Sequence, residues 1–342
     1  AAALRARFDP TSLRPRLAAC RAALERLPHG DLRQFTSAHA AADIDAVRRA
    51  LGAERIDVVG VSYGTRLALE VIRQAAPTVR RAVLDGVVPP DMGLPAAASI
   101  DNQAALDAMF DACAREPACA RRHPQLRAQW QSLLRSLGDG DGDGDGNGDA
   151  DRAGRELRLA DPLSGRATQL RLTRAGLLGL VRAPLYLPSL AAALPLAIAA
   201  ASEGDFAPLA ALAQALEGRR AQRIASGLHF ALSCSEDVRE GVPASQPSTT
   251  DRGRHSGPRD EVAADFGDDA LALYRDACSG WPRATLPAGF DRIAPATMPV
   301  LLLAGGADPA TPRRHARRVA TALGANARMV VAETAGHGLL GA

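Results

Sequence analysis

The feature that most constrains the fold is an alternation of strand and helix patterns between residues 55 and 84. The run Arg55–Val61 is short, rich in β-branched side chains and bounded by glycine, which is typical of a strand. A helical pattern follows over Thr65–Ala75, and Arg81–Leu84 is a second apolar run. A strand, a helix and a strand within about thirty residues indicate a βαβ unit. The chain is therefore expected to build a parallel sheet in an α/β fold.

The remaining segments predict one α/β domain that is interrupted by a long insertion. Residues 11–51 read as two helices, and near the C-terminus a strand, a helix and a strand are expected over Val300–Ala304, 312–323 and Arg328–Ala332. We therefore assign 1–90 and 296–342 to the core and 91–295 to a mainly helical insertion. Within the insertion, helices are expected over 101–115, 124–137, 188–202 and 206–216, and a hairpin should pair Glu156–Leu159 with Gln169–Leu172.

Composition excludes several classes of partner. Forty-one basic residues against 38 acidic ones leave a net charge of +3, which does not favour nucleic acid or an anionic membrane. The longest apolar run, 189–201, contains Pro195 and falls short of the roughly 20 residues that a membrane span needs. Residues 1–9 contain three charged side chains and do not read as a signal peptide.

A Gly-Asp repeat over 138–151 lies inside the insertion. The side chains of Asp145, Asn147, Asp149 and Glu156 have the spacing of an EF-hand calcium loop. However, Ala150 occupies the position where such a loop needs glycine, so a solvated linker is the favoured interpretation. Residues 243–260, rich in Pro, Ser and Thr, predict a second loop.

The sequence Gly60-Val61-Ser62-Tyr63-Gly64 matches the G-x-S-x-G pattern, directly between a predicted strand and a predicted helix. In that position a strained turn would expose the Ser62 hydroxyl as a nucleophile. Both glycines are expected because close packing of strand on helix leaves no room for Cβ atoms. The Tyr63 N–H, at the helix N-terminus, can donate to a developing oxyanion.

A serine nucleophile needs a base and an orienting acid, in the chain order Ser, acid, His. His337 lies in a glycine turn just beyond the last predicted strand, and Asp308 follows the Val300–Ala304 strand. Asp85, after the second strand, is the competing acid. His315 lies among four arginines on a helix and is expected at the surface. We therefore predict Ser62, Asp308 and His337 as a catalytic triad.

These motifs carry a family resemblance. The segments Gly60–Leu69, Val83–Pro90, Gly305–Pro312 and Gly336–Gly338 resemble the α/β hydrolases of the proline iminopeptidase and tripeptidyl aminopeptidase type. The resemblance implies an α/β-hydrolase fold with a helical cap. It also implies a serine exopeptidase that removes a short, often proline-ended, N-terminal unit from a peptide substrate, with the same triad and with no metal or cofactor.

Five cysteines bear on the cellular location. Cys113 and Cys119 are close enough to pair, Cys234 and Cys278 are a second candidate pair, and Cys20 is left over. Two disulfides would suit a secreted or periplasmic protein, which the family resemblance also favours. Five reduced cysteines in a cytoplasmic protein remain the alternative.

The sequence departs from the family at both ends. The family begins with additional strands and a Gly-Gly-Pro-Gly-type loop that supplies a second oxyanion donor, and it ends with a closing helix. We therefore expect this chain to be an internal portion of a longer protein, with the outer edge of the Ile56–Val61 strand unpaired.

Substrate recognition rests on fewer residues. Glu236 and Asp237 are candidates for binding the free amino group of a peptide, with helix capping as the alternative. Trp281 could line a pocket for a prolyl ring, although core packing is favoured. Two other functions remain open, an esterase or amidase for small apolar acyl groups and an inactive hydrolase-fold binding protein.

Overall fold

The computed structural model describes residues 14–137, 154–161, 164–219, 224–238, 265–267 and 269–340. The described residues form two compact units, one drawn from 1–18 and 102–223 and the other from 19–101 and 224–342. The second unit contains the sheet, and it also includes described residues of 224–295 that the sequence analysis assigned to the insertion. The Gly-Asp repeat, the suggested calcium loop up to residue 153 and the segment 243–260 lie outside the described residues.

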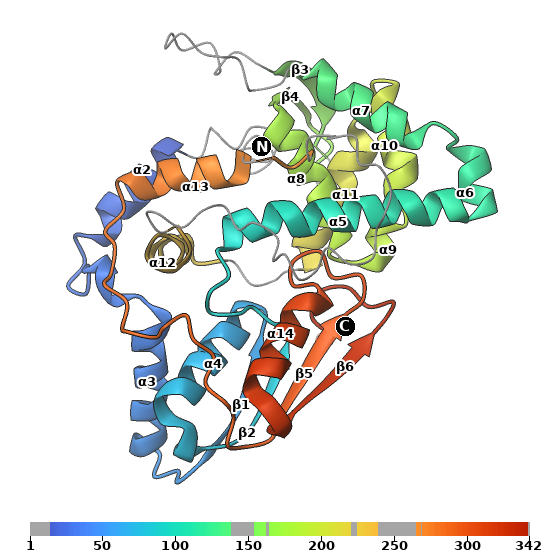
Figure 1. Cartoon of the computed structure of the whole chain (residues 1–342). Helices are drawn as coiled ribbons and strands as arrows, with labels where there is room; N and C mark the ends of the chain where they lie inside the picture. Colours follow the sequence, from blue (N-terminus) through green and yellow to red (C-terminus); the bar gives the residue numbers. More distant parts are fainter. Residues whose placement is uncertain are drawn as a thin grey trace. The chain divides into compact units, whose positions relative to one another are not determined.

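Four parallel strands form the sheet of the second unit (Figure 1). Their order is β1 (Ile56–Val61), β2 (Val79–Asp85), β5 (Val300–Gly305) and β6 (Ala327–Ala332). The register aligns Gly60 with Leu84 and Leu302 with Met329. The βαβ unit and both C-terminal strands are thus confirmed. Among the described strands β1 pairs with β2 alone, as expected for an edge.

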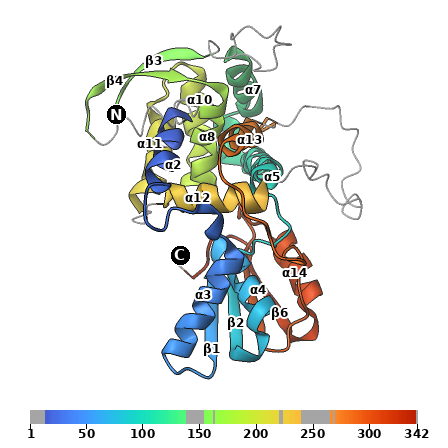
Figure 2. The same ribbon diagram turned by 90° about the vertical axis from the view of Figure 1, so that its left-hand side faces the viewer.

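Three helices of this unit cover one face of the sheet with a single apolar core. They are α3 (Ser37–Ala50), α4 (Tyr63–Ala75) and α14 (Arg313–Leu323), and Figure 2 shows α3 and α4 beside β1 and β2. Leu84 and Leu302, both fully buried, pack in one cluster with Ile72 of α4 and Val319 of α14. Side chains on the other face of the sheet are more exposed, and Val59 is 62% exposed.

The remaining elements of the second unit precede α3 or follow residue 224. The helix α2 (Arg14–Leu24), which begins in the first unit, leads to the short helix η2 (Leu32–Gln34). The helix α12 (Ser226–Leu232) continues into a π-helical turn, η5 (Ser233–Asp237), and α13 (Asp269–Ser279) follows. A disulfide between Cys234 and Cys278 joins η5 to α13. Two short helices, η3 (Ala76–Thr78) and η7 (Gly324–Asn326), precede β2 and β6.

The first unit is mainly helical. After α5 (Leu94–Arg115), which begins in the second unit, it contains α6 (Pro117–Arg122), α7 (Leu126–Ser136), α8 (Arg174–Leu185), α9 (Pro188–Ala191), α10 (Leu194–Ser202) and α11 (Ala207–Arg219). The predicted hairpin is confirmed as β3 (Arg155–Ala160) paired with β4 (Ala167–Leu172), with Leu157 opposite Leu170. A second disulfide joins Cys113 to Cys119. The sequence analysis did not predict α8, whose glycines and Pro184 weaken its helical pattern.

Candidate active site

Ser62 occupies a strained turn between β1 and α4. Its φ of 55° and ψ of −123° make it the one non-glycine residue with positive φ in the described part of the chain. Such a conformation is unfavourable for a side chain and persists where surrounding contacts enforce it. The Ser62 N–H donates to the carbonyl oxygen of Asp85, at 2.8 Å, and the Ser62 carbonyl accepts from Thr65. These contacts fix the turn to the end of β2 and to the first turn of α4.

The two glycines of this turn differ in their steric roles. A Cβ atom on Gly60 would lie 2.3 Å from the carbonyl oxygen of Gly64, so the strand can approach the helix only with glycine at this position. A Cβ atom on Gly64 would meet nothing within 4 Å. The prediction that both glycines are needed for space is therefore right for Gly60 and wrong for Gly64, whose backbone is the surface that Gly60 approaches.

Asp308 and His337 lie in direct contact. The imidazole Nδ1 of His337 is 3.0 Å from Oδ1 and 2.9 Å from Oδ2 of Asp308. The Asp308 carboxylate also accepts hydrogen bonds from the N–H groups of Ala310 and Thr311 and from the Thr311 hydroxyl. Burial alone would raise the pKa of Asp308, but the hydrogen bonds from His337 and Thr311 outweigh it and lower that pKa. Asp308 is thus held as a carboxylate that orients the imidazole.

The loop that carries His337 lies over the C-terminal ends of the strands. A Cβ atom on Gly305, the last residue of β5, would lie 2.0 Å from the carbonyl oxygen of Gly336. The imidazole lies against Gly86, where an added Cβ would be 3.2 Å from His337 Cε1. Asp85 accepts the N–H of Leu340 with Oδ2, at 2.7 Å, so it anchors the loop after the histidine. Ser62, Asp308 and His337 are therefore at one edge of the sheet.

His315 is not a surface residue, contrary to the expectation from its arginine-rich helix. It is 9% exposed, and its Nε2 lies 3.0 Å from Oδ2 of Asp101. Arg314 pairs with Oδ1 of the same Asp101 carboxylate, whereas Arg318 pairs with Asp91 and Arg313 with Glu333. A helix with a charged sequence can thus bury a histidine where a buried carboxylate from another segment pairs with it.

Glu236 and Asp237 are buried in η5, where both carboxylates have protein partners. Oε1 of Glu236 accepts the Ser37 N–H at 2.6 Å, and Oε2 accepts the Ser37 hydroxyl at 2.9 Å. Asp237 Oδ1 lies 2.7 Å from Nη1 of Arg66, a residue that is 1% exposed. Burial raises the pKa of Glu236 above its usual value, despite the Ser37 hydrogen bonds and the Arg66 charge. The structure thus brings the two predicted substrate-binding residues close to the turn that carries Ser62 (the nucleophile turn of the prediction), since Arg66 is on α4.

Arg66 also bonds to the chain that follows β2. Its Nη2 donates to the carbonyl oxygens of Pro89 and Met92. Trp281 is 5% exposed and packs on Phe230 with a ring-centroid distance of 5.6 Å, in the apolar cluster around the Cys234–Cys278 disulfide. Core packing therefore accounts for Trp281.

Sequence reasoning missed three residues that support the site, namely Ser37, Arg66 and Thr311. Thr311 could have been found, because an Asp followed three residues later by Thr is a pattern in which the carboxylate accepts local hydrogen bonds. Arg66 and Ser37 had no such signal, since their partners are 171 and 199 residues away along the chain.

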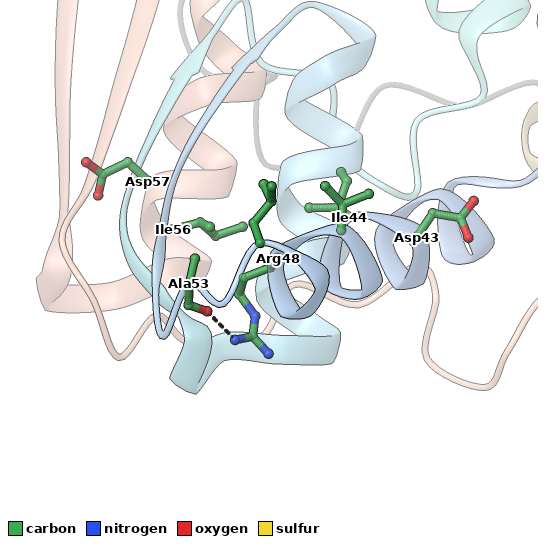
Figure 3. A pocket seen from close by; sticks show the side chains of 8 residues that line it. Asp43, Ile44, Arg48, Ala53, Ile56 and Asp57 are labelled. Atoms are coloured by element: carbon green, nitrogen blue, oxygen red, sulfur yellow. Dashed lines mark hydrogen bonds between the residues drawn. The ribbon is translucent and has the colours of Figure 1, made fainter.

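A shallow groove lies at the opposite end of β1 from Ser62 (Figure 3). It has a volume of about 340 Å³ and is lined mainly by apolar side chains of α3 and the start of β1, such as Ile44, Leu51 and Ile56. Arg48 closes one side by donating to the carbonyl oxygen of Ala53 at 2.6 Å. The groove is separated from Ser62 by the length of the strand, so we do not assign it to the candidate active site. In the described residues no cluster of His, Cys, Asp and Glu could hold a metal ion.

Comparison with known proteins agrees with this geometry. Residues 15–137 match the family model of the alpha/beta hydrolase fold, and residues 263–342 match the model of the TAP-like protein. The chain has the α/β-hydrolase fold, and its C-terminal segment resembles TAP-like proteins. The predicted resemblance to these hydrolases and the predicted fold class are thereby confirmed.

Similarity to individual relatives is confined to short segments. The chain is 41% identical over 66 residues to the tripeptidyl aminopeptidase of Streptomyces lividans, which covers 19% of this chain and 11% of that enzyme. It is 32% identical over 68 residues to the serine protease Hip1 of Mycobacterium tuberculosis, covering 20% and 13%. The matched segments thus span about an eighth of these relatives or less. An esterase from Exiguobacterium antarcticum aligns over 89% of this chain and 68% of its own, with 13% identity and a TM-score of 0.31.

Proposed function

We propose that this protein is a serine hydrolase that releases short N-terminal units from peptides. The observation that carries the proposal is the strained Ser62 at the sheet edge where Asp308 holds His337. Because Nδ1 of His337 faces Asp308, Nε2 is the nitrogen available to the Ser62 hydroxyl. The TAP-like match and the names of the two peptidases support a peptide as the substrate.

The reaction proceeds by acyl transfer. Ser62 Oγ attacks the scissile carbonyl carbon while His337 Nε2 takes the hydroxyl proton, and the resulting oxyanion accepts the Tyr63 N–H. His337 then gives this proton to the leaving amine, the C–N bond breaks, and an ester to Ser62 remains. Water attacks the ester with His337 again as base, which releases the N-terminal unit and restores the serine. No metal or cofactor enters these steps.

Recognition of the N-terminal unit is the second part of the proposal. A free ammonium group needs a carboxylate, and Glu236 and Asp237, which are bonded to Ser37 and Arg66 in the structure, are the candidates near the Ser62 turn. Proline-ended units are the first substrates to test, on the strength of the family resemblance. The two disulfides support a secreted or periplasmic location. No described helix has the length and apolar character to cross a bilayer.

Hydrolysis of a proline-ended peptide nitroanilide tests the proposal. The full chain and its Ser62→Ala variant would be compared on the substrate with a free amine and on its N-acetylated form. Cleavage of the free form alone, abolished in the variant, is the expected result. Equal cleavage of both forms would favour an esterase or amidase, and failure of a fluorophosphonate to label Ser62 would favour the inactive binding protein.

A further inference from the structure

The nucleophile turn is tied to the π-helical turn η5 through two buried connections. In the first, Arg66 of α4 pairs with Asp237 at 2.7 Å. In the second, the Tyr63 hydroxyl lies 2.9 Å from Ser37 Oγ, which in turn lies 2.9 Å from Oε2 of Glu236. Tyr63 directly follows Ser62, so the second connection ends on the residue whose N–H faces the proposed oxyanion.

The hydrogen bonds of the second connection have a defined direction. Ser37 has one hydroxyl hydrogen, and it donates this hydrogen to Glu236. The Tyr63 hydroxyl must therefore donate to Ser37 Oγ. Burial raises the pKa of Tyr63 to about 12, so the phenol keeps its hydrogen at neutral pH. The order is thus Tyr63 to Ser37 to Glu236.

We infer that Ser37 and Glu236 are positioning residues that hold Tyr63 so that its N–H points at the oxyanion. The inference rests on the proposed serine hydrolase activity. An oxyanion donor stabilises the transition state only when it is aimed at the developing charge before reaction, and small displacements reduce the rate strongly. The Tyr63 N–H has no acceptor within the helix. The Ser62 carbonyl, which shares its peptide plane, is bonded to Thr65, and the Tyr63 hydroxyl bond restrains the other end of the same residue.

The surroundings make this connection rigid. The carboxylate of Glu236 is fixed from two sides, by the Ser37 N–H and hydroxyl, and Arg66 lies 3.6 Å from its Oε2. The disulfide of Cys234 holds η5 to α13. Irregular π-helical turns occur frequently at functional sites, where they place side chains that a regular helix would not. Here η5 directs two consecutive carboxylates toward α3 and α4.

The inference differs measurably from a role of Glu236 in binding the substrate amine. An amine-binding carboxylate affects only substrates with a free amine, and mainly their KM. A residue that positions the oxyanion donor affects every acylating reagent, including those without an amine, through the rate of the chemical step. A fluorophosphonate is such a reagent, since it reacts at Ser62 through a transition state that places negative charge on oxygen.

The test is the second-order rate of Ser62 labelling by a fluorophosphonate, with the labelled fraction and the melting temperature measured alongside. We expect Tyr63→Phe and Ser37→Ala each to lower the rate by about ten-fold, with the labelled fraction unchanged. The double variant should lose no more than the slower single variant, because both substitutions break the same chain of hydrogen bonds. Tyr186→Phe, a matched hydroxyl deletion in the other compact unit, should label at the wild-type rate.

Three results would overturn the inference. Wild-type labelling rates in both single variants would show that Tyr63 needs no anchor, and a fall in the labelled fraction at unchanged rate would show a purely structural role. Multiplied effects in the double variant would show that the two residues act separately. If the wild-type protein is not labelled at all, the proposed hydrolase activity fails, and the inference fails with it.

Discussion

The hydroxyl of Thr311 donates to Oδ2 of Asp308 at 2.6 Å, while the same oxygen is held 2.9 Å from His337 Nδ1. Thr311 is 1% exposed, so this hydrogen bond is shielded from bulk solvent. Thr311 and His337 thus both hold one carboxylate in place, which couples the Asp308 turn to the imidazole.

Substitution of Thr311 by valine should lower kcat by roughly ten-fold, with little change in KM. Valine keeps the shape of the side chain but removes a donor to a charged acceptor, an interaction of about 1.5–3 kcal/mol. Thr311→Ser should restore most of kcat because it keeps the hydroxyl. The measurement is steady-state hydrolysis of whichever substrate the wild-type protein cleaves. A kcat of the valine variant equal to that of the wild-type protein would contradict the role of Thr311 in orienting Asp308.

The lowered pKa of Asp308 predicts how stability depends on pH. A carboxyl group whose pKa is lower in the folded state than in the unfolded state stabilises the fold above its unfolded pKa. That contribution is lost as pH falls through the lowered pKa of the folded protein, starting from the ordinary value of 3.8. Denaturant unfolding between pH 6 and about pH 2 should show this loss in the wild-type protein and a smaller loss in Asp308→Asn. Parallel curves for the two proteins would refute the prediction.

Removal of the Arg66 charge should destabilise the protein strongly. Arg66→Met would leave the buried carboxylate of Asp237 without its cation, and breaking a buried pair from one side costs about 3–5 kcal/mol of unfolding free energy. Arg80→Met is the matched control, because Arg80 pairs with Asp57 on the exposed surface and its loss should have little effect. Chemical denaturation measures both. Similar unfolding free energies for the two variants would mean that water or a local rearrangement compensates for the loss of the Arg66 charge.

The predictable parts of the fold are those that depend on residues close together in the sequence. The strands β1, β2, β5 and β6 are short β-branched or apolar runs next to glycine, and the turns that carry Ser62, Asp308 and His337 follow three of them. Chain order and the common edge of parallel strands were enough to group these three residues.

The surroundings of the site were not predictable, because they depend on contacts between distant segments. Ser37 and Glu236 are 199 residues apart in the sequence, and no local pattern around either residue indicates their hydrogen bond. The same limit explains the error for His315, whose neighbours in sequence are arginines but whose partner in space is Asp101. Local charge predicts solvent exposure only when no distant acid covers the helix.

The two disulfides provide a last prediction, which concerns both stability and the nucleophile turn. Under denaturing, non-reducing conditions one of the five cysteines, Cys20, should react with an alkylating reagent. The Cys234–Cys278 bridge closes a loop of 44 residues and the Cys113–Cys119 bridge one of 6. Chain entropy then gives stabilisations of about 4 and about 2 kcal/mol.

The Cys234–Cys278 disulfide also bears on the nucleophile turn, because Cys234 belongs to the turn that holds Glu236. Replacement of both Cys234 and Cys278 by serine should therefore slow fluorophosphonate labelling of Ser62. The paired Cys113→Ser and Cys119→Ser variant, in the other compact unit, should label normally. Equal labelling of both double variants would separate the disulfide from the active site.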